Sequence, residues 1–387
     1  MTERVLITGG AGFIGSHTAV QLLERGCRMR VLDALLPPVH ASAEPPPWLP
    51  ADVELVVGDV RDRDAFRRAL RGVDAVLHLA AYQDYLPDFS TFFHVNTVGT
   101  ALLYELCVAE GLPVRKVVVA SSQAVYGEGA HWCETHGIIH PGSRSDAQLR
   151  RADWEVRCPE CRRPTEWRPT DESTVNPQNQ YAISKHTQEQ VAFSLGRRHG
   201  IPTTCLRYSI TQGPWQSPSN AYSGACRIFT LRARSGRAPV VFEDGLQSRD
   251  YVHVADVARA NVLALTDGRT DGQAYNVGGA EALTTLRYAD IVREVVGLAV
   301  PAELPGCYRF GDTRHVVSDI GKLRALGWEP TSSVPEIVRE YAGWLASTGM
   351  VDGASDAALR RMFELGTLRR TDVASREAAG REAGSPR

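Results

Sequence analysis

The sequence predicts an α/β protein with a doubly wound parallel sheet, a smaller C-terminal domain and a small zinc-ribbon-like insertion. Three observations support this prediction. Short apolar, β-branched runs alternate with helical stretches, which is the pattern of parallel strands joined by crossover helices. A glycine-rich turn joins the first strand to the first helix. Two short motifs, Cys-x-x-His at 133–136 and Cys-x-x-Cys at 158–161, interrupt the alternation at metal-ligand spacing.

The composition is that of a globular protein without a strong overall charge. Hydrophobic residues make up 43% and charged residues 23% of the 387 positions, and the formal net charge is −2. This balance excludes a general attraction to nucleic acid or to anionic membranes. The chain contains neither an apolar run of about 18 residues nor a signal-peptide pattern, so we expect a cytoplasmic protein. Eight cysteines in a chain of this length do not indicate a disulfide framework.

The first strand and helix enclose a candidate anion site. Residues 5–8 predict a buried strand and residues 16–25 predict a helix, and Gly9, Gly12 and Gly15 lie between them at three-residue spacing. Glycines allow the backbone to approach a pyrophosphate, and the free N–H groups at the helix start point toward it. The strand–turn–helix context makes this a dinucleotide-binding motif of the Rossmann fold and not an isolated tight turn.

Acidic residues follow the next two predicted strands. Asp33 ends the strand at 30–33, where its carboxylate can accept both ribose hydroxyls of an adenosine and would repel a 2′-phosphate, so NAD is favoured over NADP. Asp59 and Val60 follow the strand at 53–57, where a carboxylate and a backbone amide commonly meet the adenine. The alternative for Asp59 is a loop residue that caps the following helix.

The strand predicted at 75–79 ends in the small residues Ala80 and Ala81, which leave room for a cofactor. His78 lies inside this strand, so we interpret it as a packed core histidine and not as a catalyst. The alternation continues with helices predicted at 64–70 and 96–110 and with strands at 116–120, 203–207 and 275–278.

Three polar residues predict an acid–base site. Ser122 lies just after the strand at 116–120, and Tyr181 and Lys185 are spaced i and i+4, which places both on one face of a predicted helix. A free tyrosine has a pKa near 10, but a neighbouring Lys cation favours the phenolate and makes it a usable base. Ser122 can supply a hydrogen bond to the reacting oxygen. The alternative is that Tyr181 and Lys185 are ordinary helix residues.

Nine motifs resemble those of the extended short-chain dehydrogenases/reductases, in the nucleotide-sugar epimerase and dehydratase family. They are TGGAGFIGSH at 8–17, GDV at 58–60, HLAA at 78–81, NTVGT at 96–100, SSQAVYG at 121–127, YAISK at 181–185, LRYS at 206–209, RDYVHVADVA at 249–258 and GDTRH at 311–315. The chain is similar to the group of dTDP-L-rhamnose, UDP-glucose and UDP-glucuronate 4-epimerases. The resemblance extends over about residues 3–345.

The resemblance implies roles for individual residues. Ser122, Tyr181 and Lys185 would be the catalytic set, with Tyr181 as the base. Arg249 and Arg314 would hold the substrate diphosphate, because the guanidinium fork binds phosphate oxygens bidentately; an ion pair of Arg249 with Asp250 or Asp256 is the alternative. Gln83 and Asn220 would be further substrate contacts. The implied NAD contacts are Gly9, Gly12, Phe13, Ile14, Gly15, Asp33, Asp59, Val60, Leu79, Ala80, Ala81, Asn96, Tyr181 and Lys185.

The residues after Ser122 indicate the reaction. Family members that eliminate water carry an Asp-Glu pair there, and decarboxylating relatives tend to carry a Glu, but this chain has Gln123 and Ala124. Neither can shuttle a proton, so we expect a 4-epimerase that works through a transient 4-keto sugar. A decarboxylase, a dehydratase or a 4-keto reductase is the alternative. Ile210 stands where the family usually has a polar Asn, so the identity of the sugar stays open.

The predicted domains follow from these assignments. We expect an NAD-binding domain at 1–130, 170–212 and 249–279, a metal-binding insertion at 131–169, a nucleotide-sugar domain at 213–248 and 280–347, and a C-terminal helix with a flexible tail at 348–387. The family likeness also implies a homodimer that forms through the helices around 97–111 and 182–198.

The insertion predicts a structural zinc site. Cys133, His136, Cys158 and Cys161 form two chelating pairs, each with two intervening residues. A segment this small has too little core to order itself, so the metal would supply the folding energy. His131 or His140 could replace His136, and the alternative is a loop with four reduced side chains.

The insertion is also rich in arginine and tryptophan, which suggests a rival function. A non-catalytic, NAD-sensing regulator could bind nucleic acid or a partner protein through this segment. Interspersed Asp and Glu residues and the intact Ser122, Tyr181 and Lys185 argue against that function. We therefore expect a nucleotide-sugar substrate and no nucleic-acid or membrane partner.

Overall fold

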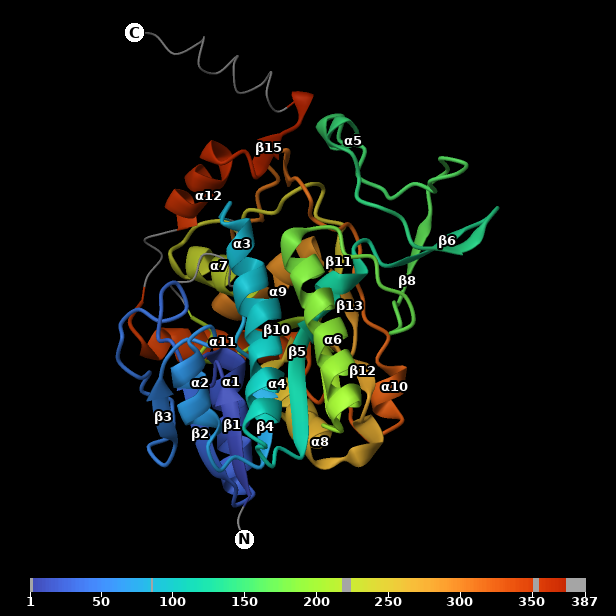
Figure 1. Cartoon of the computed structure of the whole chain (residues 1–387). Helices are drawn as coiled ribbons and strands as arrows, with labels where there is room; N and C mark the ends of the chain where they lie inside the picture. Colours follow the sequence, from blue (N-terminus) through green and yellow to red (C-terminus); the bar gives the residue numbers. More distant parts are fainter. Residues whose placement is uncertain (1–2, 85, 218–223, 351–354, 374–387) are drawn as a thin grey trace.

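Seven parallel strands form the central sheet of the computed structural model, in the order β12-β9-β5-β4-β1-β2-β3 (Figure 1). The structure describes residues 3–84, 86–217, 224–350 and 355–373. The strand order reverses between β1 and β4, and doubly wound sheets bind ligands at the carboxyl ends of the strands beside such a point. The strands are β1 (Arg4–Thr8), β2 (Arg28–Asp33), β3 (Glu54–Val57), β4 (Ala75–His78), β5 (Lys116–Ser122), β9 (Thr203–Tyr208) and β12 (Gln273–Val277).

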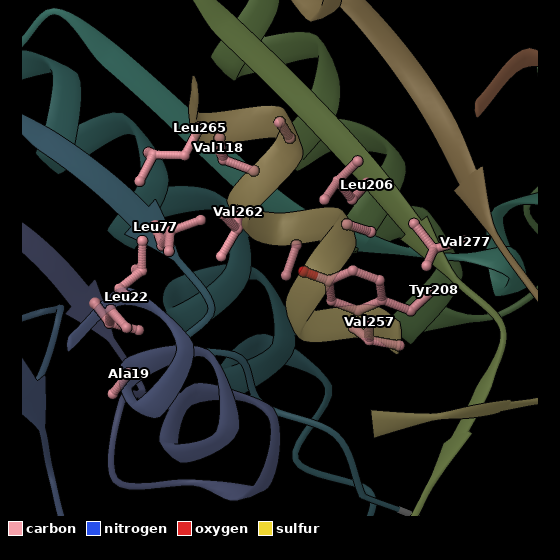
Figure 2. Close-up of a cluster of buried hydrophobic side chains, with 14 of the residues drawn as sticks. Ala19, Leu22, Leu77, Val118, Leu206, Tyr208, Val257, Val262, Leu265 and Val277 are labelled. Carbon is pink, nitrogen blue, oxygen red and sulfur yellow. The ribbon is translucent and has the colours of Figure 1, made fainter. Parts of the chain in front are cut away.

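Helices cover both faces of this sheet, which confirms the predicted fold class. In β1, Val5 and Ile7 join one apolar cluster and Leu6 joins the other, as the two-residue period of a strand requires. Figure 2 shows part of the first cluster, where α1 and α8 pack against the sheet. The covering helices are α1 (Phe13–Glu24), α2 (Arg63–Leu70), α4 (Gly99–Ala109), α6 (Gln180–His199) and α8 (Val254–Thr266).

The helix predicted at 96–110 begins earlier than the sequence suggested. Helix α3 (Phe89–Phe92) runs into a π-helical stretch η1 (Phe93–Val98) and then into α4. The combined helix at 89–109 is long and apolar enough to cross a membrane, but half of its most apolar window is buried inside the protein. Among the described residues it is the one helix that meets this test, and its packing against the sheet is that of a core helix.

A smaller domain packs beside the sheet around its own apolar core. Phe229, Tyr288 and Val338 are buried in this core, and one residue comes from each of its three helices. A three-stranded sheet in the order β10-β11-β13 completes the domain. The elements are α7 (Gly224–Arg234), α9 (Thr285–Val296), α11 (Val334–Ser347), β10 (Ile210–Gln212), β11 (Ser248–His253) and β13 (Ala282–Thr284). The short helices η3 (Gly268–Thr270) and α10 (Gly321–Arg324) pack instead on the domain of the large sheet, against α8 and β12.

The insertion forms a small antiparallel sheet in the order β7-β6-β8, which projects from the body of the protein (Figure 1). It follows the short helix η2 (Gln123–Tyr126) that leaves the end of β5. Its elements are β6 (Ala130–Cys133), β7 (Gly137–Ile139), α5 (Asp146–Arg150) and β8 (Glu166–Arg168).

The C-terminal segment binds both the smaller domain and the insertion. Strand β15 (Leu368–Arg370) pairs with β14 (Cys307–Arg309), and helix α12 (Ser355–Glu364) precedes it. Arg369 of β15 forms an ion pair of 2.6 Å with Asp146 of α5, which also accepts the Tyr308 hydroxyl at 2.8 Å. The last part of the predicted flexible tail, 374–387, lies outside the described residues.

Candidate functional site

The glycine turn has space for backbone only. Gly9 has φ of +68°, and a Cβ atom on it would lie 2.8 Å from the amide nitrogen of Ala80. A Cβ on Gly15 would lie 2.5 Å from the Cα of Gly10 and 2.5 Å from the carbonyl oxygen of Gly9. Helix α1 starts directly after Gly12, which provides no side-chain cap. The amides of its first turn are therefore available to an anionic group such as a pyrophosphate.

We expect Gly15→Ala to remove bound NAD and to lower the free energy of unfolding by about 1–3 kcal/mol, the usual cost of overpacking. The new methyl group would collide with backbone atoms that cannot move without opening the turn. Nucleotide released from the denatured protein and thermal melting measure the two effects. Gly343→Ala in α11 is the matched control, because a Cβ there meets nothing within 4 Å. NAD content equal to that of the wild type would contradict this account of the turn.

Asp33 is fixed beside this turn at the end of β2. Its buried carboxylate accepts the amides of Ala11 and Leu35, each at 3.0 Å, and lies 3.3 Å from His40 Nε2. The carboxylate is therefore held at the edge of the glycine turn, where the sequence predicts a ribose contact. No sequence pattern pointed to His40, because it lies in the proline-rich connection after β2.

Asp59 does not cap the next helix. Asp62 is the N-cap residue of α2, and its side chain accepts the amides of Asp64 and Ala65. Asp59 instead binds the backbone amide of Arg61 at 2.8 Å and its guanidinium at 2.7 Å. The contact of Asp59 and Val60 with an adenine stays a prediction.

Asn96 has a connecting role that the sequence did not reveal. It is fully buried in the π-helical stretch, and its side chain exchanges two hydrogen bonds with the backbone of Tyr82, at 2.8 and 3.1 Å. It also donates to Ser184 Oγ at 2.9 Å. Asn96 thus joins the loop after β4 to α6, the helix of Tyr181 and Lys185. In this loop Leu79 and Ala80 are half-buried, and Ala81 and Gln83 are exposed.

The predicted acid–base residues lie on two elements that meet. Ser122 ends β5, and its hydroxyl accepts the amide of Ala124 at 3.1 Å. Lys185 is buried in α6, one turn after Tyr181, and its Nζ donates to the carbonyl of Ala120 in β5 at 2.5 Å. Burial lowers the pKa of Lys185 to about 8. The ammonium group is therefore held beneath the strand end that carries Ser122.

Two neighbouring side chains of this region cannot act as acids or bases. His78 contacts the hydroxyls of Thr8 and Thr100 at 2.8 and 3.0 Å, and burial together with the Lys185 cation lowers its pKa to about 3. It is a neutral core histidine, as the sequence indicated. Gln123 is buried beside Ser122 and accepts the hydroxyl of Ser318 at 3.4 Å, and an amide does not ionise.

Arg249 binds backbone carbonyl groups and not the carboxylates considered above. Its guanidinium donates to the carbonyls of Ser248 and Arg314, each at 2.8 Å, and of Thr313 at 2.6 Å. Asp250 instead accepts the amide of Gly279, and Asp256 binds Arg259, Thr331 and Ser332.

Arg314 is fully buried and surrounded by three carboxylates. Its guanidinium contacts Glu155 of the insertion at 2.6 Å, Asp244 at 2.6 and 2.9 Å, and Glu243 at 3.1 Å. The sequence could not show this arrangement, because Glu155 is 159 residues away along the chain. The group expected to bind a diphosphate is thus occupied by protein carboxylates. Asn220, the other predicted substrate contact in this domain, lies outside the described residues.

The four predicted metal ligands lie together in the insertion. Cys133 Sγ is 3.6 Å from both Cys161 Sγ and His136 Nδ1, and Cys158 Sγ is 3.3 Å from the same nitrogen. All four ligand atoms lie within 4.8 Å of one another, and the cysteines are not joined in disulfides. Tetrahedral zinc with Zn–S near 2.3 Å and Zn–N near 2.0 Å would separate two sulfurs by about 3.8 Å and a sulfur from a nitrogen by about 3.5 Å. The three distances of 3.3–3.6 Å are close to these values.

Glu160 orients the histidine of this cluster. Its carboxylate lies 3.4 Å from His136 Nε2, and Nδ1 faces the sulfurs. This arrangement favours a proton on Nε2 and leaves Nδ1 able to bind a metal. The backbone amides of Glu160 and Cys161 donate to the Cys158 sulfur. His131 is occupied elsewhere, by Thr165 at 2.9 Å and the carbonyl of Glu128 at 3.1 Å, so it does not replace His136.

Comparison with known proteins gives a consistent set of relatives. The model of the NAD dependent epimerase/dehydratase family matches residues 5–148 and 159–278. The dTDP-L-rhamnose 4-epimerase of Burkholderia thailandensis is 36% identical over 357 residues, which cover 89% of this chain and 95% of that enzyme.

Two solved structures have the same fold. The Thermotoga maritima UDP-glucose 4-epimerase with UDP-glucose has a TM-score of 0.72 and 27% identity, over 90% of this chain and all of that one. The Thermus thermophilus UDP-glucose 4-epimerase in complex with NAD has a TM-score of 0.68 and 30% identity, and the match covers 89% of this chain and 99% of that one.

Proposed function

The chain belongs to the NAD dependent epimerase/dehydratase family, and from this premise we propose that it is a 4-epimerase of a nucleotide-diphosphate hexose. The observation that carries the proposal is the residue pair after Ser122. Lys185 and Ser122 are assembled at the end of β5, but Gln123 and Ala124 add no ionisable group there. A site with one base and no second acid supports removal and return of hydrogen at a single carbon.

NAD fits the glycine turn and the fixed carboxylate of Asp33, and when bound it would accept and return the hydride of the sugar carbon. Tyr181 takes the proton of the 4-hydroxyl group. Lys185 has a pKa of about 8 and is mostly charged at neutral pH, so it stabilises the phenolate of Tyr181. Ser122 donates a hydrogen bond to the same sugar oxygen. The resulting 4-keto sugar rotates within the site, so that its other face is turned to the cofactor, and it is reduced on that face.

We also propose that the insertion holds one structural zinc ion. Cys133, His136, Cys158 and Cys161 supply four protein ligands at nearly tetrahedral spacing, which leaves no position for a substrate. The metal therefore has a folding role. It takes no part in the proton or hydride transfer.

The ion pairs of the insertion argue against the rival nucleic-acid function. Five of the seven arginines at 131–169 form ion pairs with acidic residues, so the basic run is largely neutralised and presents little net positive charge. The pairs are Arg144–Glu243, Arg150–Asp146, Arg157–Asp153, Arg163–Glu134 and Arg168–Glu166.

A homodimer is the proposed assembly. Val98, Val108 and Ile183 are exposed apolar residues on the helices that the family likeness assigns to the dimer interface. Light scattering after gel filtration measures the mass, and a monomer at micromolar concentration would contradict this proposal.

The proposed reaction is tested by NMR of the purified protein with a panel of UDP-, dTDP-, GDP- and ADP-hexoses, without added cofactor. We expect interconversion of C4 epimers of one nucleotide sugar with no net formation of NADH, because the hydride returns to the same carbon. Accumulation of a keto, dehydrated or decarboxylated sugar would replace the epimerase with one of the alternative reactions.

A further inference from the structure

We infer that Glu155, which the insertion supplies, is a positioning residue for the sugar-nucleotide site: it fixes Arg314, and the backbone of Arg314 fixes the guanidinium of Arg249. The inference rests on the proposed function, in which Arg249 binds the diphosphate. Residues 149–158, which include Glu155, fall between the two segments that match the family model. The contact is therefore a feature of this chain's insertion.

The first contact joins the insertion to Arg314. One Glu155 oxygen lies 2.6 Å from Nη2 and 3.2 Å from Nε of Arg314, and the other lies 3.4 Å from His315 Nε2. The Arg314 side chain has no solvent exposure. A buried guanidinium needs carboxylate partners to offset its lost hydration, so removal of one partner displaces it.

Arg144, a second insertion residue, holds the same region from the other side. Its guanidinium makes a bidentate pair with Glu243, at 2.9 Å for each contact, and donates to the carbonyl of Asp312 at 2.9 Å. It also contacts Glu128 at 3.3 Å, and Glu128 accepts the backbone amide of Arg314 at 2.6 Å. Arg144 of the insertion and Glu128, which precedes the insertion, thus fix the backbone at 312–314.

The last contact reaches Arg249. Its guanidinium donates to the carbonyls of Thr313 and Arg314, so the orientation of its fork follows the backbone at these two residues. No carboxylate pairs with Arg249 among the residues that the structure describes. Its positive charge therefore stays available for an anionic ligand such as a nucleoside diphosphate.

Arg314 itself is a poor candidate for that ligand. A guanidinium has five N–H donors, and the three carboxylates around Arg314 make five contacts with its three nitrogens. Direct binding of a diphosphate would require Glu155 or Asp244 to leave. The geometry assigns the diphosphate to Arg249 and gives Arg314 the role of orienting it.

The test compares Glu155→Gln with Glu166→Gln in the full-length, metal-loaded protein. Glu166 is the matched control, because it lies in the same insertion, is exposed and, within the described part of the chain, forms an ion pair only with its neighbour Arg168. We expect Glu155→Gln to weaken binding of the nucleoside diphosphate (UDP, dTDP, GDP or ADP) that the wild type binds. We also expect it to raise KM by about threefold to thirtyfold, the range of coupling through intermediate residues, with kcat nearly unchanged. Glu155→Asp, which restores the charge, should recover part of the loss. Calorimetry and steady-state kinetics provide the readouts, and zinc content and melting temperature confirm the fold.

The outcomes separate this inference from the proposed function. Folded, metal-loaded Glu155→Gln with unchanged nucleotide binding and KM would overturn the role of Glu155. If Glu155→Gln does not fold, nucleotide binding and KM of Glu155→Asp are compared with those of Glu166→Gln instead, and unchanged values would again overturn the role of Glu155. If the wild type binds a nucleoside diphosphate but converts no nucleotide sugar, the epimerase proposal fails. The role of Glu155 is then still tested by comparing nucleotide binding of the two variants. If the wild type binds none of the four nucleoside diphosphates of the panel, UDP, dTDP, GDP and ADP, Arg249 is no diphosphate site and the inference fails.

Discussion

Tyr181→Phe is expected to lower kcat by about 10²–10⁴-fold, the usual contribution of a positioned acid–base group. The substitution removes only the phenolic oxygen, which accepts the sugar proton in the proposed mechanism. Lys185, which stabilises the phenolate in the proposed mechanism, would keep its contacts with Ala120 and Gln188. NAD content and melting temperature should therefore stay near the wild-type values while epimerisation is lost. The rate is measured with the nucleotide sugar that the panel identifies.

Tyr341→Phe is the matched control for this change. Tyr341 is buried in α11, and its hydroxyl has no hydrogen-bond partner among the described residues. We expect this variant to keep wild-type turnover. If Tyr181→Phe retained more than about a tenth of the wild-type rate, general-base catalysis by Tyr181 would be wrong.

Cys158→Ser is expected to abolish zinc binding and to unfold the insertion. Structural zinc contributes about 10–16 kcal/mol of apparent binding free energy in small zinc-binding peptides, far more than the few core residues of a short segment can replace. The Cys158 side chain is fully buried in the cluster, so no solvent ligand can take its place without rearrangement. We expect one zinc ion per wild-type chain by elemental analysis, less than a tenth of that in the variant, and rapid proteolysis within residues 131–169.

Cys27→Ser controls for the loss of a thiol as such, because Cys27 is half-buried beside α1 and lies outside the cluster. Its zinc content should equal that of the wild type. Wild-type protein that contains no zinc after purification and does not bind it when titrated would refute the metal site.

Features that depend on neighbouring residues in the chain could be predicted from the sequence. The glycine turn, Asp33 at the end of β2 and the two metal-binding motifs all combine local spacing with local structure. The spacing of Tyr181 and Lys185 indicated their helix face in the same way. The fold class followed because each strand and helix has its own periodicity.

Contacts between distant residues could not be predicted. The environment of Arg314 depends on carboxylates 70, 71 and 159 residues away. No local sequence pattern predicts ion pairs between residues so far apart in the chain. Family likeness assigns Asn96 to the cofactor, but its hydrogen bonds to Tyr82 and Ser184 depend on a π-helical stretch that sequence periodicity does not show. The start of the helix at Phe89 was missed for a similar reason, because the π-helical turn breaks the regular 3.6-residue pattern.

The pairing of Arg369 with Asp146 has a consequence for biosynthesis. During translation the insertion leaves the ribosome long before Glu243, Arg314 and Arg369 exist, so it cannot dock until almost the whole polypeptide has been made. Its four proposed metal ligands, in contrast, are complete once Cys161 has emerged. The order of the chain therefore fixes the order of maturation: a nascent insertion that holds the proposed zinc ion would bind it first and would join the finished body last.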